Sequence, residues 1–485
     1  MFGGRRNRWA FLSILFASFY DIKTLDKPYS YTIMILFKRS ILAFIFLSFC
    51  TIPTLQGQTW ESLFNGKNLK GWQLLNGKAK FEVLDGAIVG TTQLDTPNTF
   101  LATKKKFSDF ILEMEFKADD RINSGIQFRS ESRKEYRNGH VYGYQYEIDP
   151  SGKLWTGGIY DEERRGWLYP LSYNEQAQNA YRHNAWNKVR IEAYKHSIRT
   201  WINGIPCANI WDDATSEGFI ALQIHDIYGN LEQLGLTISW RNIRICTQDV
   251  EQYLTCTTES ASLRNMVRNT LTKQEKLEGW QLLWNGKSFT GWMNASADEA
   301  EHGDWLIEDG MLTHRESVDG SRSVLTSCKK YKDYLLSVDF KISEKSDGGI
   351  LYLVPTDSKG VSIPSAGFQY QIIDDFNHPD AKAGIDGDRR VGSLYDLLPA
   401  SKRKLFLIRD FNTVQIKVKG NHVEHWLNGI KVLEFERNTS TWNALVARSP
   451  FASCIEFGKD FEGYISLISQ RGQIWFTNIK IKELD

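Results

Sequence analysis

Apolar and polar side chains alternate with a period of two along much of the chain. The pattern is clear in segments 110–116, 188–193, 335–340 and 414–418. Successive side chains of a β-strand point to opposite faces, so these segments are predicted to be half-buried antiparallel strands. The pairs Asn203-Gly204 and Asn428-Gly429 each separate two such runs, and a two-residue type I′ hairpin turn favours this dipeptide. The pattern predicts an all-β fold.

The sequence contains two copies of one pattern. Residues 63–72, LFNGKNLKGW, return at 283–292 as LWNGKSFTGW, and the WING of 201–204 returns as the WLNG of 426–429. Because these matches keep their order and a near-constant offset, they indicate a tandem duplication in which each copy forms a β-sandwich.

The repeat divides the chain into four parts. We assign residues 1–58 to a signal-peptide region, 59–249 to the first sandwich, 250–278 to a linker and 279–485 to the second sandwich. In the linker, Thr272 and Glu275 have the spacing of a helix capping box, which predicts short helices there.

The amino-terminal region has the features of an export signal. Lys38 and Arg39 precede the apolar run 41–49, which has the length of a signal-peptide core and is short for a membrane span. With translation starting at Met34, we expect a bacterial protein exported to the periplasm, the outer envelope or the medium, with no stable membrane insertion after processing. A membrane anchor and a lipid attached to Cys50 are the alternatives.

Charge and composition narrow the classes of function. The chain has 59 Lys and Arg against 58 Asp and Glu, a net charge of +1, which disfavours a dedicated nucleic-acid binder. Hydrophobic residues at 42% exclude a disordered chain. The 6 cysteines show no CxxC spacing, so neither a zinc site nor a disulfide framework is predicted. We expect scattered buried thiols, with a single Cys246 to Cys256 bridge as the alternative.

Six ordered motifs run through the first copy. They are FNGK at 64–67 with Gly71-Trp72, NSGIQFR at 123–129, Trp186-Asn187, WING at 201–204, ALQIH at 221–225 and WRNIRI at 240–245. Together they resemble the 3-keto-disaccharide hydrolase domain family, and the second copy shares the resemblance. It implies two tandem concanavalin A-like jelly-roll β-sandwiches, joined by a short, partly helical linker, and glycosides oxidised at C3 as substrates.

A ketone at C3 sets the chemistry that such a substrate invites. It acidifies the hydrogen on C2, so a base can remove that proton and the C1 glycosidic oxygen can leave by β-elimination. Water added to the resulting enone completes a net hydrolysis. The site needs a carboxylate or imidazole base, an acid near the leaving oxygen, and donors for the enediolate. A partner oxidoreductase that makes the ketone is implied.

The candidate catalytic groups lie on strands of the first copy. Gln145, Glu147 and Asp149 alternate with apolar residues and therefore share one strand face. We expect neighbouring strands to bring Arg129 and His225 to this face, with Glu147 or His225 as base and Asp149 or the other partner as acid. Paired charges on a solvated sheet are the alternative.

Substrate-binding residues are predicted on the same face and in the segment 155–169, which combines glycines, aromatic side chains and both signs of charge. Aromatic rings pack against sugar C–H surfaces, and arginines bind hydroxyl pairs. The predicted binding residues of the first copy are Gln127, Gln145, Tyr160, Arg164, Trp167, Gln223 and Arg241. A surface ion-pair cluster around a buried tryptophan is the alternative for this segment.

The second copy departs from the pattern. Leu353, Gln470 and Thr477 stand where the first copy has Arg129, His225 and Arg241, and Gln369 stands where the family usually places a glutamate. These neutral replacements argue against catalysis by this copy. It is predicted to support binding through Gln371, Asp374, His378 and Tyr395. The acidic stretch from Asp374 onward could hold a calcium-like divalent metal, with a solvated loop as the alternative.

The leading hypothesis is an exported enzyme that cleaves 3-keto-glycosides or 3-keto-disaccharides by C2 proton abstraction, β-elimination and hydration, with the first copy catalytic. The alternative is a non-catalytic, lectin-like carbohydrate-binding protein, because one fold serves both functions. An ordinary endo-glycanase lacks support, since no strand shows the close carboxylate spacing of sandwich glucanases.

Overall fold

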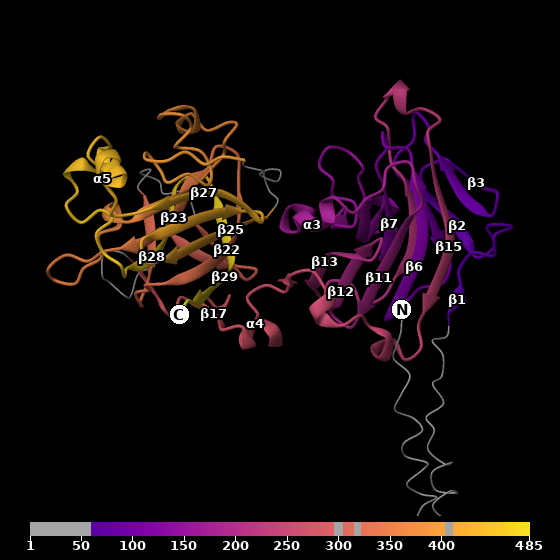
Figure 1. Cartoon of the computed structure of the whole chain (residues 1–485), viewed down its shortest axis with the longest axis horizontal. Helices are drawn as coiled ribbons and strands as arrows, with labels where there is room; N and C mark the ends of the chain where they lie inside the picture. The colour runs from indigo at the N-terminus through magenta and orange to yellow at the C-terminus, as the bar shows by residue number, and fades with distance from the viewer. Residues whose placement is uncertain (1–59, 295–303, 315–321, 403–410) are drawn as a thin grey trace, which may run out of the picture. The chain divides into compact units, whose positions relative to one another are not determined.

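The computed structural model describes residues 60–294, 304–314, 322–402 and 411–485. The predicted signal-peptide region, with Met34 and Cys50, lies outside the described residues. Within the described ranges, no helix is long and apolar enough to cross a membrane. Strands dominate the chain and the helices are short, which confirms the prediction of an all-β protein (Figure 1).

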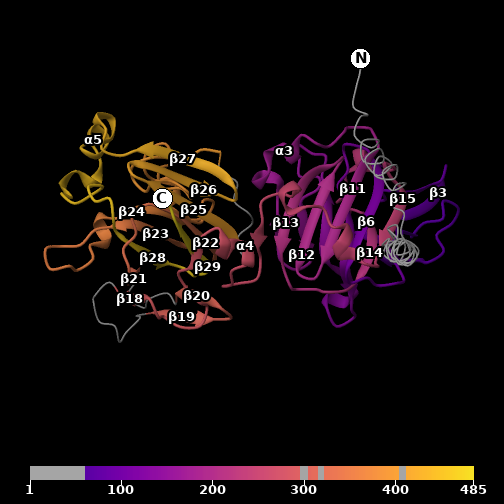
Figure 2. The ribbon, with the colours of Figure 1, turned by 60° about the horizontal axis from the view of Figure 1, so that its bottom comes forward.

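The first copy folds into two facing sheets. Its back sheet has the strand order β16 (Arg264–Asn265), β13 (Ile205–Trp211), β12 (Ser197–Ile202), β11 (Asn187–Tyr194), β6 (Phe110–Ala118), β15 (Thr237–Cys246), β4 (Ala87–Thr91) and β3 (Lys80–Leu84), with β1 (Glu61–Ser62) beside β15. Its front sheet has the order β10 (Gly166–Tyr169), β9 (Ile159–Glu162), β8 (Val141–Ile148), β7 (Ser124–Ser132), β14 (Phe219–Ile224), β5 (Thr99–Thr103) and β2 (Trp72–Asn76). Figure 2 shows β13, β12, β11 and β6 of the back sheet side by side.

The second copy repeats this arrangement. Its back sheet has the order β19 (Trp305–Glu308), β20 (Met311–His314), β29 (Ile474–Glu483), β22 (Tyr334–Ile342), β25 (Asn412–Lys419), β26 (His422–Leu427) and β27 (Ile430–Glu436), with β17 (Trp280–Leu282) beside β29. Its front sheet has the order β18 (Trp292–Asn294), β21 (Ser323–Ser327), β28 (Tyr464–Arg471), β23 (Asp347–Val354) and β24 (Phe368–Ile373). Both copies are therefore jelly-roll sandwiches, as expected.

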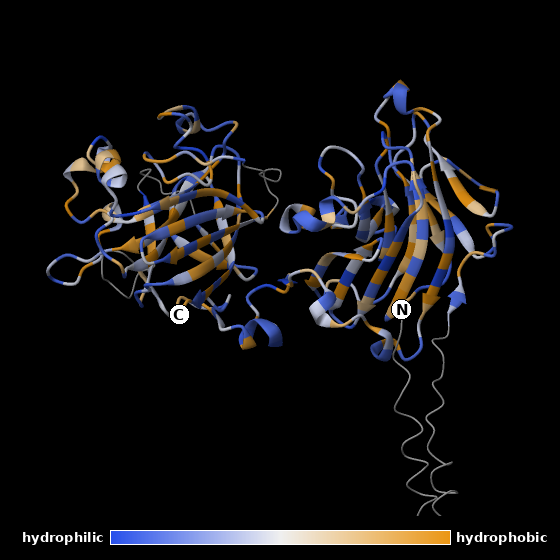
Figure 3. Ribbon diagram, viewed as in Figure 1, coloured by the Kyte–Doolittle hydropathy of each residue, from blue (hydrophilic) through white to orange (hydrophobic). Residues whose placement is uncertain are grey.

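Each sandwich has its own apolar core between its two sheets. In the first, Leu112 and Ile191 of the back sheet belong to one buried cluster with Ile126 and Tyr146 of the front sheet. The second has a separate cluster of the same kind. Figure 3 shows hydrophobic and hydrophilic residues alternating along the strands. The inward residues fill the core, so the outward polar residues of each front sheet remain available for a site.

Local turn and cap signals also appear as predicted. Asn203 and Gly204 have φ angles of 51° and 84°, and they join β12 to β13. The same turn at Asn428 and Gly429 joins β26 to β27. The side chain of Thr272 accepts a hydrogen bond from the backbone N–H of Glu275, which completes the capping box of α4 (Lys273–Leu277). The other α-helices are α3 (Glu175–Gln178) and α5 (Ser440–Val446).

Cys207, Cys246, Cys256 and Cys454 are free thiols. The alternative of a bridge from Cys246 to Cys256 is therefore wrong. The prediction of scattered buried thiols is confirmed for Cys207 and Cys246, and it is wrong for Cys256 and Cys328, which are exposed.

Candidate active site

The first front sheet carries a polar pocket of about 440 Å³ on the face that points away from the core. Strand β8 supplies its floor, β9 and the turn that follows supply one wall, and the loop after β14 supplies another. The predicted site residues that line it are Gln145, Glu147, Tyr160, Arg164, Trp167 and His225. Strand alternation therefore identified the correct face of β8.

Glu147 lies at the centre of a hydrogen-bonded chain of polar side chains. Its carboxylate accepts from Asn123 Nδ2 at 2.7 Å and from Gln145 Nε2 at 2.9 Å. Gln145 in turn accepts from Gln127 Nε2, and the amide oxygen of Gln127 accepts from Ser130 Oγ. The side chain of Glu147 is oriented by this chain, and burial raises its pKa to about 7.

Glu162, which the sequence interpretation missed, is a second buried carboxyl group in the same pocket. It is 7% exposed and accepts a hydrogen bond from Asn98 Nδ2 at 3.0 Å. Burial raises its pKa to about 7, and the negative charge of Glu147 acts in the same direction. The signal was present in the sequence, because Glu162 and Tyr160 alternate on the short strand β9, but the whole segment was interpreted as a loop.

His225 is held at the pocket by its own backbone neighbourhood. Its Nδ1 lies 2.7 Å from the carbonyl oxygen of Asp226. A carbonyl can only accept, so Nδ1 carries the hydrogen and Nε2 of the neutral ring is the basic nitrogen. The N–H of Asp226 donates to Asn98 Oδ1 at 2.8 Å. Asn98 therefore fixes both Glu162 and the loop that carries His225.

The segment after β8 forms a wall of aromatic and cationic groups. The ring of Trp167 packs edge to face against Tyr160, with ring centroids 5.3 Å apart. Arg164 donates from Nε to Asp161 Oδ1 at 2.8 Å, and its Nη2 is buried without a hydrogen-bond partner among the described residues. An anionic group in the pocket could accept from this nitrogen.

Arg129 requires a correction, because the structure places it away from the pocket. The pairing of β7 with β8 shifts between Phe128 and Glu131, and Arg129 has a φ angle of 46°. This bulge breaks the alternation, so Arg129 does not share a face with Gln127. Its guanidinium is buried and donates to the carbonyl oxygens of Ser108 and Lys195 and to Asp109.

Arg241 requires a similar correction. It lies on β15 of the back sheet, donates to Glu115 Oε2 at 2.7 Å and stacks over the ring of Trp186. Residues of opposite sheets that face outward lie on opposite sides of a sandwich. Arg241 is therefore separated from Glu147 by the core.

Three further predicted residues lie beside the pocket without lining it. Asp149 follows the end of β8, and its Oδ1 accepts from the N–H of Ser151 at 3.1 Å. Gln127 is buried behind Gln145, and Gln223 is buried on β14. The charge of Asp149 contributes to the raised pKa of Glu147 after the larger effect of burial, and Gln127 reaches the pocket only through its hydrogen bond to Gln145.

In the second copy, the register corrects one correspondence. Gly125 of β7 pairs with Glu147, and Gly349 of β23 pairs with Gln371. Gln371, and not Gln369, therefore occupies the position of Glu147. Tyr395 donates from its hydroxyl to Asp380 Oδ2 at 3.1 Å.

Asp374 and His378 have different surroundings. The carboxylate of Asp374 accepts from the backbone N–H groups of Lys345, Phe376 and Asn377, so it caps a turn. These hydrogen bonds hold the pKa of Asp374 below its usual value against the opposing effect of burial. The imidazole of His378 does not take part in this turn cap and lies beside the carboxylate of Asp347.

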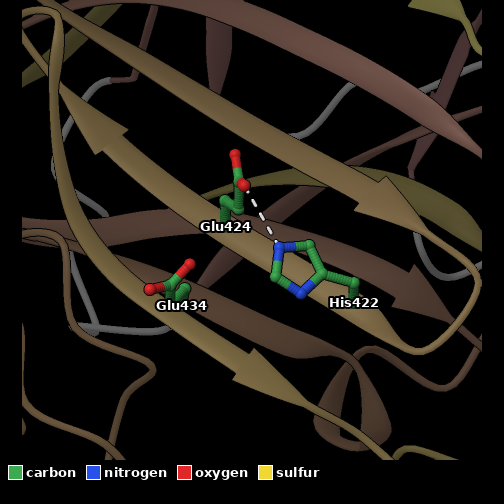
Figure 4. A group of neighbouring side chains, drawn as sticks. All are labelled: His422, Glu424 and Glu434. Atoms are coloured by element: carbon green, nitrogen blue, oxygen red, sulfur yellow. Dashed lines mark hydrogen bonds and ion pairs between the residues drawn. The ribbon is translucent and has the colours of Figure 1, made fainter.

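One group among the described residues has the spacing of metal ligands, and it lies outside the predicted acidic stretch. His422 and Glu424 of β26 and Glu434 of β27 lie together, as Figure 4 shows. Glu424 accepts from Trp426 Nε1, and Lys431 forms an ion pair with Glu434. These partners satisfy the carboxylates, so the cluster is explained as an ion-pair network.

The fold and the site define a jelly-roll β-sandwich protein with a carboxyl-lined polar pocket on one sheet. The sequence matches the profile of the 3-keto-alpha-glucoside-1,2-lyase-like domain over residues 59–246 and 279–482. The chain belongs to this family, with two copies of the domain, which confirms the resemblance described above. The family supports a carbohydrate-active enzyme with a carbohydrate substrate.

Individual proteins are similar to parts of this chain. A 3-keto-disaccharide hydrolase of Bacteroides thetaiotaomicron is 30% identical over 253 residues, covering 47% of this chain and 86% of that protein. Among solved structures, a protein of Parabacteroides distasonis assigned to the glycosyl hydrolases is 29% identical, with a TM-score of 0.41, covering 45% of this chain and 100% of the other. A second protein of the same organism and assignment is 25% identical, with a TM-score of 0.33, covering 42% and 99%.

Proposed function

We propose that the first sandwich cleaves 3-keto-glycosides, including 3-keto-disaccharides, by elimination followed by hydration. Family membership and the relative that is a 3-keto-disaccharide hydrolase support this substrate class. The observation that carries the proposal is the pair Glu147 and Glu162, two buried carboxyl groups in one pocket whose pKa values both lie at about 7. Such groups exchange protons readily at neutral pH.

The hydrogen bonds divide the roles between the two carboxyl groups. Glu147 accepts from two amide donors, Asn123 and Gln145, which favour its ionised form. Glu162 accepts from Asn98 alone and feels the charge of Glu147, so it keeps its proton longer. Glu147 is therefore the base that takes the C2 proton, and Glu162 is the acid that protonates the leaving oxygen.

The remaining groups fit the other steps. When the C2 proton leaves, the electron pair moves into a C2–C3 double bond and negative charge develops on the C3 oxygen. We assign Arg164 as the donor for that oxygen, because this residue lines the pocket and its Nη2 has no hydrogen-bond partner among the described residues. The charge then returns to re-form the C3 ketone, a C1–C2 double bond forms and the C1–O bond breaks. Water adds to C1, with His225 Nε2 accepting its proton, and C2 regains a proton.

Two parts of the proposal concern the cell. A separate oxidoreductase supplies the C3 ketone, since the scheme begins with an already oxidised sugar. Export through the amino-terminal signal places the enzyme in the bacterial envelope or outside it.

The calcium-like metal near Asp374 belongs to the second copy and stays a prediction.

Turnover of 3-keto-trehalose by the full chain tests the proposal. Glu147→Gln and Glu162→Gln should each lower kcat by about a hundredfold or more, because each removes a group that transfers a proton. Glu82→Gln is the matched control, since Glu82 lies on β3 of the back sheet and pairs with Lys80. Circular dichroism shows that the variants are folded.

Two results would contradict the proposal. Unchanged turnover in both variants means that other residues carry the reaction. A parent chain that binds glycans tightly but turns over no 3-keto sugar favours the alternative of a lectin-like binding protein.

A further inference from the structure

The second front sheet holds a carboxylate and an imidazole that face each other without a hydrogen bond. Asp347 Oδ1, at the start of β23, lies 3.9 Å from His378 Nε2. The two residues are 8% and 4% exposed, and neither of these atoms has a hydrogen-bond partner among the described residues. A buried polar atom without a partner is costly. Two of them side by side indicate a ligand group that satisfies both.

The hydrogen bonds of His378 define the chemistry of that group. Its Nδ1 accepts from the backbone N–H of Asp380 at 3.1 Å. A backbone N–H can only donate, so the neutral ring carries its hydrogen on Nε2. The pair thus offers one donor, His378 Nε2–H, and one acceptor, Asp347 Oδ1. A hydroxyl group accepts from the first and donates to the second, at about 2.8 Å from each.

The pair is held in place by its surroundings. Asp380 accepts from the guanidinium of Arg389 at 2.6 Å and from the hydroxyl of Tyr395. These hydrogen bonds tie the segment around His378 to Arg389 and Tyr395, which lie further along the chain. The charges of Arg471, Arg322 and Asp380 also act on Asp347. The two facing atoms thus belong to an ordered polar network.

The first sandwich has no such pair. The repeat aligns Asn123 with Asp347, and the strand register aligns Glu147 with Gln371. In the first copy, the amide of Asn123 stands just before β7 and the carboxylate of Glu147 on β8. In the second copy, the carboxylate of Asp347 stands on β23 and the amide of Gln371 on β24. This exchange leaves the second copy with a carboxylate at a different place, beside an imidazole from the segment after β24.

We propose that the second sandwich binds a pyranose through one ring hydroxyl held between Asp347 and His378, as a carbohydrate site separate from the pocket of the first sandwich. The choice of a sugar as the source of the hydroxyl rests on the proposed function. The site binds and does not cleave, because Gln371 replaces the base Glu147.

Calorimetric titration of the full chain with the 3-keto derivative of 1,5-anhydroglucitol tests the proposal. This probe keeps the oxidised ring but has no aglycone to lose. We expect two binding sites per chain in the parent. Asp347→Ala and His378→Phe should each weaken the second site by about ten- to a hundredfold, since each removes a hydrogen bond to a charged or buried group. His422→Phe, on the back sheet of the same copy, is the matched control.

A crystal of the parent soaked with the same probe gives a readout that does not depend on the variants. Density for the sugar between Asp347 and His378 is expected. A water molecule alone at this position, or binding that neither Asp347→Ala nor His378→Phe weakens, would overturn the inference. A parent chain that binds the probe between Asp347 and His378 but does not turn over 3-keto-trehalose contradicts only the proposed function. A parent chain that turns over 3-keto-trehalose but does not bind the probe there contradicts only this inference.

Discussion

Two side chains of the first pocket keep their protons at a pH where a glutamate is normally ionised. Burial raises the pKa of Glu147 and of Glu162 from 4.5 to about 7. The folded protein therefore binds more protons than the unfolded chain between these values, and its free energy of unfolding falls as the pH rises through this range.

The stability of Glu162→Gln should show this effect. Below pH 4.5 the neutral Glu162 contributes fully, and the contribution is lost as the pH rises to about 7. A glutamine has no such dependence. The parent should therefore lose up to about 3 kcal/mol relative to the variant between these limits. Urea unfolding of both proteins from pH 5 to pH 8 measures the difference, and parallel stability curves would contradict it.

The pH dependence of catalysis follows from the same two groups. An ionised base and a protonated acid are needed together, so kcat/KM for 3-keto-trehalose should peak near pH 7 and fall on both sides. Glu162→Gln should keep the acid limb, which reports the ionisation of Glu147, and lose the alkaline limb. A variant profile that keeps both limbs at reduced height would assign the acid to another residue.

At the scale of the strands, sequence alternation succeeds where a strand is regular and fails where it is not. Strand β8 runs without interruption from Val141 to Ile148, so the shared face of Gln145 and Glu147 could be predicted. In β7 a bulge intervenes before Arg129, and alternation cannot reveal a bulge. Glu162 was missed because four residues of β9 are too few for a clear period.

The two copies show what Arg129 does instead. Arg129 donates to the carbonyl of Lys195, in the turn between β11 and β12. In the second copy, Leu353 takes the place of Arg129 with a similar φ angle of 50°. There Arg437 donates to the carbonyl of Gly420, in the turn between β25 and β26. Both sandwiches thus use a buried guanidinium to fix the same hairpin.

Arg129→Leu should therefore affect stability and leave catalysis unchanged. The substitution leaves the carbonyl oxygens of Ser108 and Lys195 without the donors that Arg129 supplies, so the free energy of unfolding should fall by about 2–3 kcal/mol. The KM for 3-keto-trehalose should stay within about twofold, because the side chain does not reach the pocket. Arg241→Leu is the control, since an exposed ion pair contributes at most about 1 kcal/mol. A raised KM in Arg129→Leu alone would return this residue to the site.

For the molecule as a whole, the two proposals assign cleavage to the first sandwich and binding to the second. Ile159 pairs with Tyr146 in the first copy, and Leu394 pairs with Tyr370 in the second. After Leu394 the chain makes a turn, in which the N–H groups of Leu397 and Leu398 both donate to the carbonyl oxygen of Leu394, so the extended strand that carries Glu162 in the first copy is not repeated. The second copy also has Gln371 in place of the base Glu147. The repeat could be predicted from the sequence, but these two differences need the strand register.

All turnover by the full chain should therefore depend on the first sandwich. Glu147→Gln should lower kcat for 3-keto-trehalose by about a hundredfold or more although the second copy is intact, because Gln371, which takes the position of Glu147 in that copy, cannot accept the C2 proton. Asp347→Ala should keep kcat within about twofold, since it alters only the binding site of the second copy. Steady-state kinetics of the two variants measure both effects. Residual turnover in Glu147→Gln that disappears when Asp347→Ala is added would show that the second sandwich also cleaves the substrate.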